Sequence, residues 1–157
     1  MANTSIEWPR RRWLALPLCL AVSAAWTQAA GTGEGVDVWK SPTCGCCQDW
    51  ISHLESNGFR VRSHDEGNTA ARQRLGIPVR LGSCHTARVG GYAIEGHVPA
   101  RDIRRLLKER PAAIGLAVPD MPVGSPGMDG PAYGMRKDSY DVLLVAKDGS
   151  ATPYQPD

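Results

Sequence analysis

The sequence has little net charge, few aromatic residues and no apolar run long enough to span a membrane. Its 157 residues include 18 Lys and Arg and 16 Asp and Glu, for a net charge of +2, and only 6% are aromatic. Without a basic surplus, the chain carries no electrostatic footprint of a nucleic-acid-binding protein. It also has no acidic tail, no collagen-like glycine period and no set of apolar runs of about 20 residues, which excludes a multi-span membrane protein. The remaining composition predicts one globular domain.

The first thirty residues are organised as an export signal. Arg10–Arg12 precede an uncharged apolar run over residues 13–25, and small residues follow near Ala29. This order is typical of a secretory signal peptide, and the run is shorter than the about 20 residues that span a bilayer. We therefore predict a signal peptide over residues 1–29 and a periplasmic mature chain without a membrane anchor. Removal of the signal peptide takes away three arginines and Glu7, which leaves equal numbers of basic and acidic residues in the mature chain.

Local patterns predict alternating strands and helices. Apolar–polar alternation indicates strands, and helical spacing between capping residues indicates helices. Strands are expected over residues 36–40, 59–62, 86–89 and 92–95, helices over 46–57, 68–75 and 99–110, and a last hairpin over 140–146 and 151–154. The Pro- and Gly-rich segment 115–134 shows no periodicity, so we expect a loop there.

This order predicts the fold class. A β-α-β-α-β-β-α succession with a CxxC motif at the first strand-to-helix junction is typical of a thioredoxin-like α/β domain. We place that domain over residues 30–112. Residues 113–157 are then a Pro/Gly/Met-rich C-terminal extension that ends in the hairpin and contributes to the site described next.

Three of the four cysteines outside the predicted signal crowd into one turn, Cys44, Cys46 and Cys47. Disulfides are common in exported proteins, but bridges within such a short turn constrain little chain, so the spacing favours other sulfur chemistry. Cys44 and Cys47 have the spacing of a redox-active pair, and a helix N-terminus favours their thiolates. A spare thiol at Cys46 would invite wrong disulfides in an exchange enzyme. Clustered thiolates instead suit a soft metal ion, with Cu(I) first and Zn²⁺ next.

Further candidate ligands lie later in the chain. Cys84 comes just before the predicted hairpin, where a thioredoxin-like fold would bring it against the CxxC turn. If Cys84 and His85 both lie in a strand, their side chains point to opposite faces, which makes His85 a weaker candidate than His97. Met121 and Met128 place soft thioethers in a segment without helical context.

Taken together, these motifs resemble the CopG family of periplasmic copper-resistance proteins. The resemblance covers about residues 36–128 and rests on Ser41-Pro-Thr-Cys-Gly-Cys-Cys47 with Trp50, Ser83-Cys-His-Thr-Ala87, Gly91-Tyr92, Glu95-Gly-His-Val-Pro99 and Met121-Pro-Val-Gly-Ser-Pro-Gly-Met128. It implies a thioredoxin-like domain whose C-terminal extension helps to bind metal. It also implies copper ions bridged by cysteine sulfurs and interconversion of Cu(I) and Cu(II) in detoxification. The sequence departs from the family pattern at Asp120, where we expect Gly.

The resemblance also implies a ligand set. Carried over by motif, the thiolate ligands are Cys44, Cys46, Cys47 and Cys84, with His85, His97, Met121 and Met128 as secondary candidates. The expected partners are copper ions and copper-efflux components of the periplasm, with no nucleic acid, and we expect a monomer. Three functions stay open: a copper oxidoreductase, a copper chaperone or store without turnover, and a metal-free thiol–disulfide oxidoreductase. Structural zinc is the alternative metal.

Overall fold

The computed structural model describes residues 1–2 and 33–154. The chain separates into two units, Met1–Ala30 and Gly31–Asp157, and the fold described below belongs to the second. Almost all of the predicted signal peptide lies outside the described residues. Among the described residues, no helix is long and apolar enough to cross a membrane.

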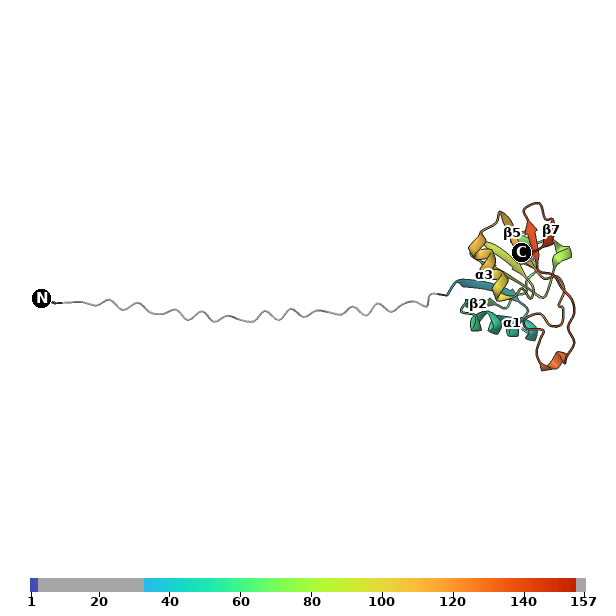
Figure 1. The fold of residues 1–157 in the computed structure, drawn as a ribbon, viewed down its shortest axis with the longest axis horizontal. Coiled ribbons are helices and arrows are strands. Elements are labelled where there is room, and N and C mark those ends of the chain that lie inside the picture. Colours follow the sequence, from blue (N-terminus) through green and yellow to red (C-terminus); the bar gives the residue numbers. More distant parts are fainter. Residues whose placement is uncertain (3–32, 155–157) are drawn as a thin grey trace. The chain divides into compact units, whose positions relative to one another are not determined.

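One sheet of seven strands organises the described part of the chain (Figure 1), in the order β2-β1-β3-β4-β5-β6-β7. The strands are β1 Gly35–Lys40, β2 Arg60–His64, β3 His85–Val89, β4 Tyr92–Glu95, β5 Ala113–Ala117, β6 Leu143–Ala146 and β7 Ala151–Pro153. The pairs β1–β2 and β4–β5 are parallel, and the other pairs are antiparallel. The helices are α1 Gly45–Ser56, α2 Thr69–Arg74 and α3 Ala100–Glu109, and single 3₁₀ turns form at Val79–Leu81 and Pro131–Tyr133.

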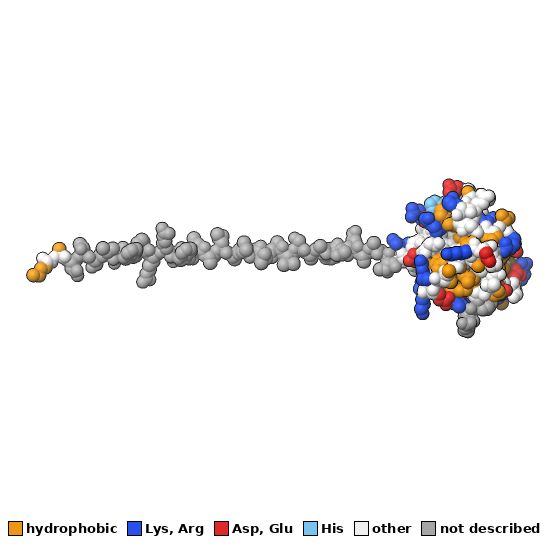
Figure 2. All heavy atoms as spheres, turned by 90° about the horizontal axis from the view of Figure 1, so that it is seen from above, with side chains coloured by type: hydrophobic (Ala, Val, Ile, Leu, Met, Phe, Trp, Pro, Cys, Tyr) orange, Lys and Arg blue, Asp and Glu red, His pale blue; other side chains and the backbone are white. Residues whose placement is uncertain are grey.

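Apolar side chains cover both faces of the sheet. The larger cluster joins α1 and α3 to one face through Trp50, Leu54, Ile103 and Leu106, among others. The smaller cluster lies around Ile77, Leu81, Ala93, Ala117 and Val145. At the surface, Figure 2 shows basic and acidic side chains interspersed, as expected from the nearly balanced charge.

The mixed α/β class is confirmed, and the predicted helices and strands are present with ends shifted by a few residues. One expectation was wrong: residues 115–117, assigned to a loop, belong to β5, which lies between β4 and β6. Leu116 packs in the larger cluster and Ala117 in the smaller one. A strand buried on both faces carries no apolar–polar alternation, which is why the pattern was invisible. Gly115 suits this place because a Cβ there would lie 1.7 Å from the Ala93 carbonyl oxygen.

Candidate metal centre

The cysteine turn begins where β1 ends. Pro42 interrupts the strand, the Cys44 amide donates to the Ser41 carbonyl at 3.1 Å, and α1 starts at Gly45. The thiols of this turn therefore lie at the N-terminal end of a helix, as predicted, where the helix dipole favours negative charge.

Two of the cysteines are joined rather than free. Cys44 and Cys47 form a disulfide, whereas Cys46 and Cys84 are free thiols. The expectation that the spacing disfavours a bridge in this turn is thereby corrected. Residues three apart at the start of a helix lie on the same side of it, so their sulfur atoms meet in spite of the tiny loop.

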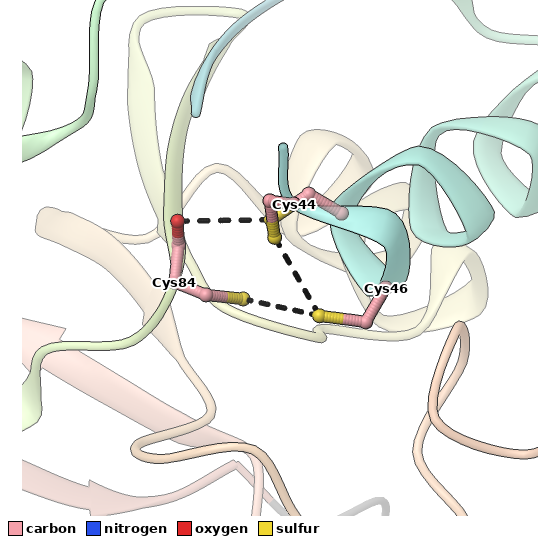
Figure 3. Close-up of side chains that lie close together, drawn as sticks. Cys44, Cys46 and Cys84 are labelled. Carbon is pink, nitrogen blue, oxygen red and sulfur yellow. Dashed lines mark hydrogen bonds between the residues drawn. A yellow bond between two sulfur atoms is a disulfide. The ribbon is translucent and has the colours of Figure 1, made fainter. Parts of the chain in front are cut away.

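All four sulfur atoms nevertheless gather in one place, within 4.8 Å of one another. Figure 3 shows the Cys46 side chain reaching from α1 toward Cys84, which lies just before β3. The Cys46 Sγ is 3.6 Å from the Cys44 Sγ and 3.9 Å from the Cys84 Sγ. The sheet register explains the approach: Lys40 at the end of β1 pairs with His85 at the start of β3. The expected position of Cys84 against the cysteine turn is confirmed.

Two histidines converge on the same sulfur atom. The Cys84 Sγ lies 3.3 Å from His85 Nδ1 and 3.1 Å from His97 Nε2. The expectation that Cys84 and His85 point to opposite faces was wrong. Cys84 precedes β3, so the alternation of side chains along a strand does not apply to it. His97 reaches the site from beyond the end of β4.

The second ring nitrogen of His97 is anchored by the C-terminal segment. Its Nδ1–H donates to the Pro126 carbonyl at 2.8 Å. This bond leaves the Nε2 lone pair directed at Cys84, the arrangement typical of a metal-binding histidine oriented by an outer-shell carbonyl. Sequence analysis could not have found Pro126 as a functional residue, because its contribution is a backbone oxygen.

His85 is fully buried against aromatic rings. Its ring centroid is 4.3 Å from that of Trp50 and 4.9 Å from that of His97. Its Nε2 finds no hydrogen-bond partner among the described residues. Burial, aided by His97, holds the pKa of His85 well below its usual range, and burial also lowers the pKa of His97. Both imidazoles are therefore neutral at pH 7, which is the form that binds metal.

The Cys84 thiol is held in its protonated form. Burial, together with the neighbouring Cys46, raises its pKa to about 12. A metal ion that binds the Cys84 sulfur at neutral pH must displace this proton, and burial makes that thiol inert in the absence of a strong cation.

The methionines occupy two different environments. Met121 is half-exposed and lines a cleft of about 380 Å³ that Cys84, Arg72 and Ser83 also line. Met128 is buried, and its amide donates to the Ser125 carbonyl at 2.8 Å within a tight loop. Their roles as ligands stay predictions.

That loop lies directly on the cysteine helix. Gly127 has a φ of +84°, and a Cβ on it would lie 2.7 Å from both the Cys46 carbonyl oxygen and the Trp50 amide nitrogen. Gly127→Ala is therefore expected to lift the loop and to cost about 1–3 kcal/mol of stability through backbone strain. Gly130→Ala is the matched control, since nothing lies within 4 Å of its Cβ position. Urea unfolding of both variants checks this, and equal stabilities would contradict it.

Asp120 departs from the expected Gly but keeps the conformation that glycine favours, with a φ of +60°. Its amide donates to the Gly82 carbonyl at 3.3 Å, and its carbonyl accepts a short hydrogen bond from the Ser83 hydroxyl. Asp tolerates the left-handed region better than most residues. The segment that leads to Met121 is thus fastened, through its backbone, beside Cys84.

Comparison with known proteins places this geometry in a family. A family model described as "Protein of unknown function, DUF411" matches residues 81–128. A solved structure titled "Copper resistance protein copG- Form 2" is 48% identical to this chain, with a TM-score of 0.71. The match covers 77% of this chain and 95% of that chain. The chain belongs to the CopG family of copper resistance proteins.

A second CopG structure agrees with the first. "Copper resistance protein copG- Form 1" is 49% identical with a TM-score of 0.70, and the match covers 76% of this chain and 93% of that chain. No curated protein matches the chain. The identity extends well beyond the cysteine turn, so the CopG resemblance of the sequence motifs is confirmed.

Proposed function

We propose that this chain is an exported copper-binding protein that holds copper in a cysteine thiolate cluster and interconverts Cu(I) and Cu(II) in copper resistance. The observation that carries the proposal is the convergence of four sulfur atoms within 4.8 Å, at the place where two buried imidazoles also meet. Membership of the CopG family supports copper as the metal.

The donor set suits copper. Thiolates are soft ligands that favour Cu(I), neutral imidazoles bind copper in either oxidation state, and a thioether at Met121 or Met128 would add a further soft donor. His85 already directs its Nδ1 at the Cys84 sulfur, and its buried Nε2 has no hydrogen-bond partner among the described residues. Zinc, the alternative, is satisfied by four cysteines alone and needs neither histidine.

The disulfide sets a condition on binding. While Cys44 and Cys47 are bridged, only Cys46 and Cys84 supply thiol groups, and reduction of the bridge yields the full set. The same pair supplies redox equivalents. Two Cu(II) ions accept one electron each while the Cys44–Cys47 dithiol becomes a disulfide and releases two protons, and the reverse reaction oxidises two Cu(I).

Domain organisation and surroundings are part of the proposal. Residues 1–29 act as a signal peptide for export to the periplasm, and residues 30–112 form a thioredoxin-like domain. Residues 113–157 form an extension that contributes to the metal site. The packing of Gly127 on α1 and the bond from His97 to Pro126 support the last point. The partners are copper ions and copper-efflux components, and the protein acts as a monomer.

Titration of the protein with Cu(I) under anaerobic conditions tests metal binding. The chain without residues 1–29 is prepared once with the Cys44–Cys47 bridge reduced and once with it oxidised. We expect the reduced protein to bind more than one Cu(I) per chain, with thiolate charge-transfer bands, and the oxidised protein to bind less. Binding of zinc in preference to copper would support structural zinc, and no metal binding with disulfide-exchange activity would support the oxidoreductase.

A second measurement separates redox chemistry from storage. Reduced protein is mixed with Cu(II), and Cu(I) and free thiols are counted. The proposal predicts two Cu(I) formed for every two thiols lost. A chaperone or store would hold copper with no change of oxidation state and no loss of thiols.

A further inference from the structure

A buried carboxylate lies behind the candidate metal centre and is used by none of the chemistry described so far. Glu95, the last residue of β4, is fully buried. Its Oε1 accepts from Arg72 Nε at 2.9 Å and from Arg72 Nη2 at 2.8 Å. Its Oε2 accepts from the Thr86 hydroxyl at 2.6 Å. Burying an ion pair costs desolvation energy that can exceed the attraction between the two charges. A gain in stability therefore does not by itself explain why this pair is present.

The pair holds both backbone polar groups of one residue, Ser83. The Ser83 amide donates to Glu95 Oε1 at 2.7 Å. The Ser83 carbonyl accepts from Arg72 Nη2 at 2.5 Å and from Asn68 Nδ2 at 3.1 Å. Both backbone groups of the residue before Cys84 are therefore held by charged or amide side chains, which fixes the direction in which the chain enters Cys84.

The same anchor reaches the second ligand segment. His97 follows Glu95 with one residue between them, Gly96, whose amide donates to the His85 carbonyl at 3.0 Å. Gly96 has a φ of +71°, and a Cβ on it would lie 2.7 Å from the Ser83 side chain. Ser83 and Gly96 thus pack against each other without space between them. The residue before Cys84 is therefore packed against the residue before His97, and Glu95 and Arg72 hold it there.

We propose that Glu95 and Arg72 are positioning residues of the metal centre, whose hold on the Ser83 backbone keeps Cys84 and His97 in place to bind copper together. This inference rests on the proposed copper-binding function. It adds two residues whose hydrogen bonds described above go to each other, to Thr86 and to the Ser83 backbone. In this role the buried ion pair acts as an outer shell that orients the candidate ligands.

Conservative variants test the proposal without removing a side chain from the core. Arg72→Lys keeps the charge but cannot reach Glu95 and the Ser83 carbonyl with a planar fork. Glu95→Gln keeps the shape but removes the charge. The matched control is Arg88→Lys, since Arg88 lies on β3 and pairs with Asp37 at 3.0 Å on the exposed surface. Circular dichroism verifies the fold of each variant.

The first readout needs no copper. In the reduced, metal-free protein, the iodoacetamide alkylation rates of Cys84 and Cys46 are measured separately by mass spectrometry. In Arg72→Lys and Glu95→Gln we expect the Cys84-to-Cys46 rate ratio to rise, because of these two cysteines only Cys84 follows the anchored residue Ser83, while Arg88→Lys keeps the wild-type ratio. An unchanged ratio, including an equal acceleration at both cysteines, would overturn the positioning role.

The second readout is competition for Cu(I) with a chromophoric chelator. Loss of an outer-shell partner typically costs 10–100-fold in metal affinity, so we expect Cu(I) affinity about tenfold weaker in the two variants and unchanged in the control. Wild-type affinity in both variants would overturn the proposal. If the wild-type protein itself binds no Cu(I), the proposed function fails, whereas the alkylation ratio still decides whether the pair positions Cys84.

Discussion

Replacing Cys46 with serine is expected to abolish stoichiometric copper binding while leaving the fold intact. Cys46 occupies the middle of the cluster, with its Sγ 3.6 Å from that of Cys44 and 3.9 Å from that of Cys84. A hydroxyl in its place is a hard donor that Cu(I) disfavours. Because Cys46 is itself proposed to touch the metal, the loss of Cu(I) affinity should exceed the 10–100-fold typical of outer-shell residues.

The fold should tolerate this change. Cys46 is only half-buried, lies in the first turn of α1 and takes no part in the disulfide. We therefore expect the stability of metal-free Cys46→Ser to stay within about 0.5 kcal/mol of wild type. Ser52→Ala, on an exposed turn of the same helix, is the control for copper binding. Chelator competition and urea unfolding provide the two measurements. Full copper loading of the serine variant would refute the cluster.

Much of the fold was readable because half-buried strands and amphipathic helices leave a periodic pattern. The hairpin of β3 and β4 was readable from Gly90 and Gly91 at its turn, although all four residues of β4 are buried. β5 was missed because it offers neither signal. Leu116 and Ala117 are buried on different faces of the sheet, so hydrophobicity along this strand carries no period, and the neighbouring prolines suggested a loop.

The candidate site divides in the same way. The cysteines stood out because their spacing has few structural uses, and the strand order brought Cys84 to them through the pairing of Lys40 with His85. The direction of His85 was mispredicted because it depends on whether Cys84 lies inside β3 or one residue before it. A boundary of that kind is not fixed by local sequence.

The support of the site was not predictable at all. The Pro126 carbonyl that binds His97 is a backbone group, and any residue type would supply it. Glu95 lies in a strand whose four residues are all buried, and a sequence does not say that Arg72, from a different element, will meet it there. Such partners are defined by tertiary packing, which local patterns do not encode.

Trp50 is the residue whose loss should damage the fold and the metal centre together. It is fully buried in α1, its Nε1–H donates to the Val98 carbonyl at 2.9 Å, and its ring packs on His85 with 4.3 Å between centroids. Trp50→Ala is expected to cost about 3–5 kcal/mol through lost packing and the cavity that remains. A domain of ordinary stability has about 5–15 kcal/mol to lose. The alanine variant should therefore unfold at much lower urea concentration.

A milder substitution separates the two roles. Trp50→Phe keeps an aromatic ring against His85 but loses the bond to the Val98 carbonyl, which should cost about 1–3 kcal/mol. Val98 follows His97 directly, so this loss also loosens a candidate ligand, and Cu(I) affinity should fall. Trp39→Phe is the matched control, because the Trp39 ring stacks on His64 at 4.9 Å rather than on a candidate ligand. Urea unfolding combined with Cu(I) competition measures both effects. If both phenylalanine variants bind Cu(I) equally well, Trp50 serves the core alone and the hydrogen bond to Val98 does not position His97.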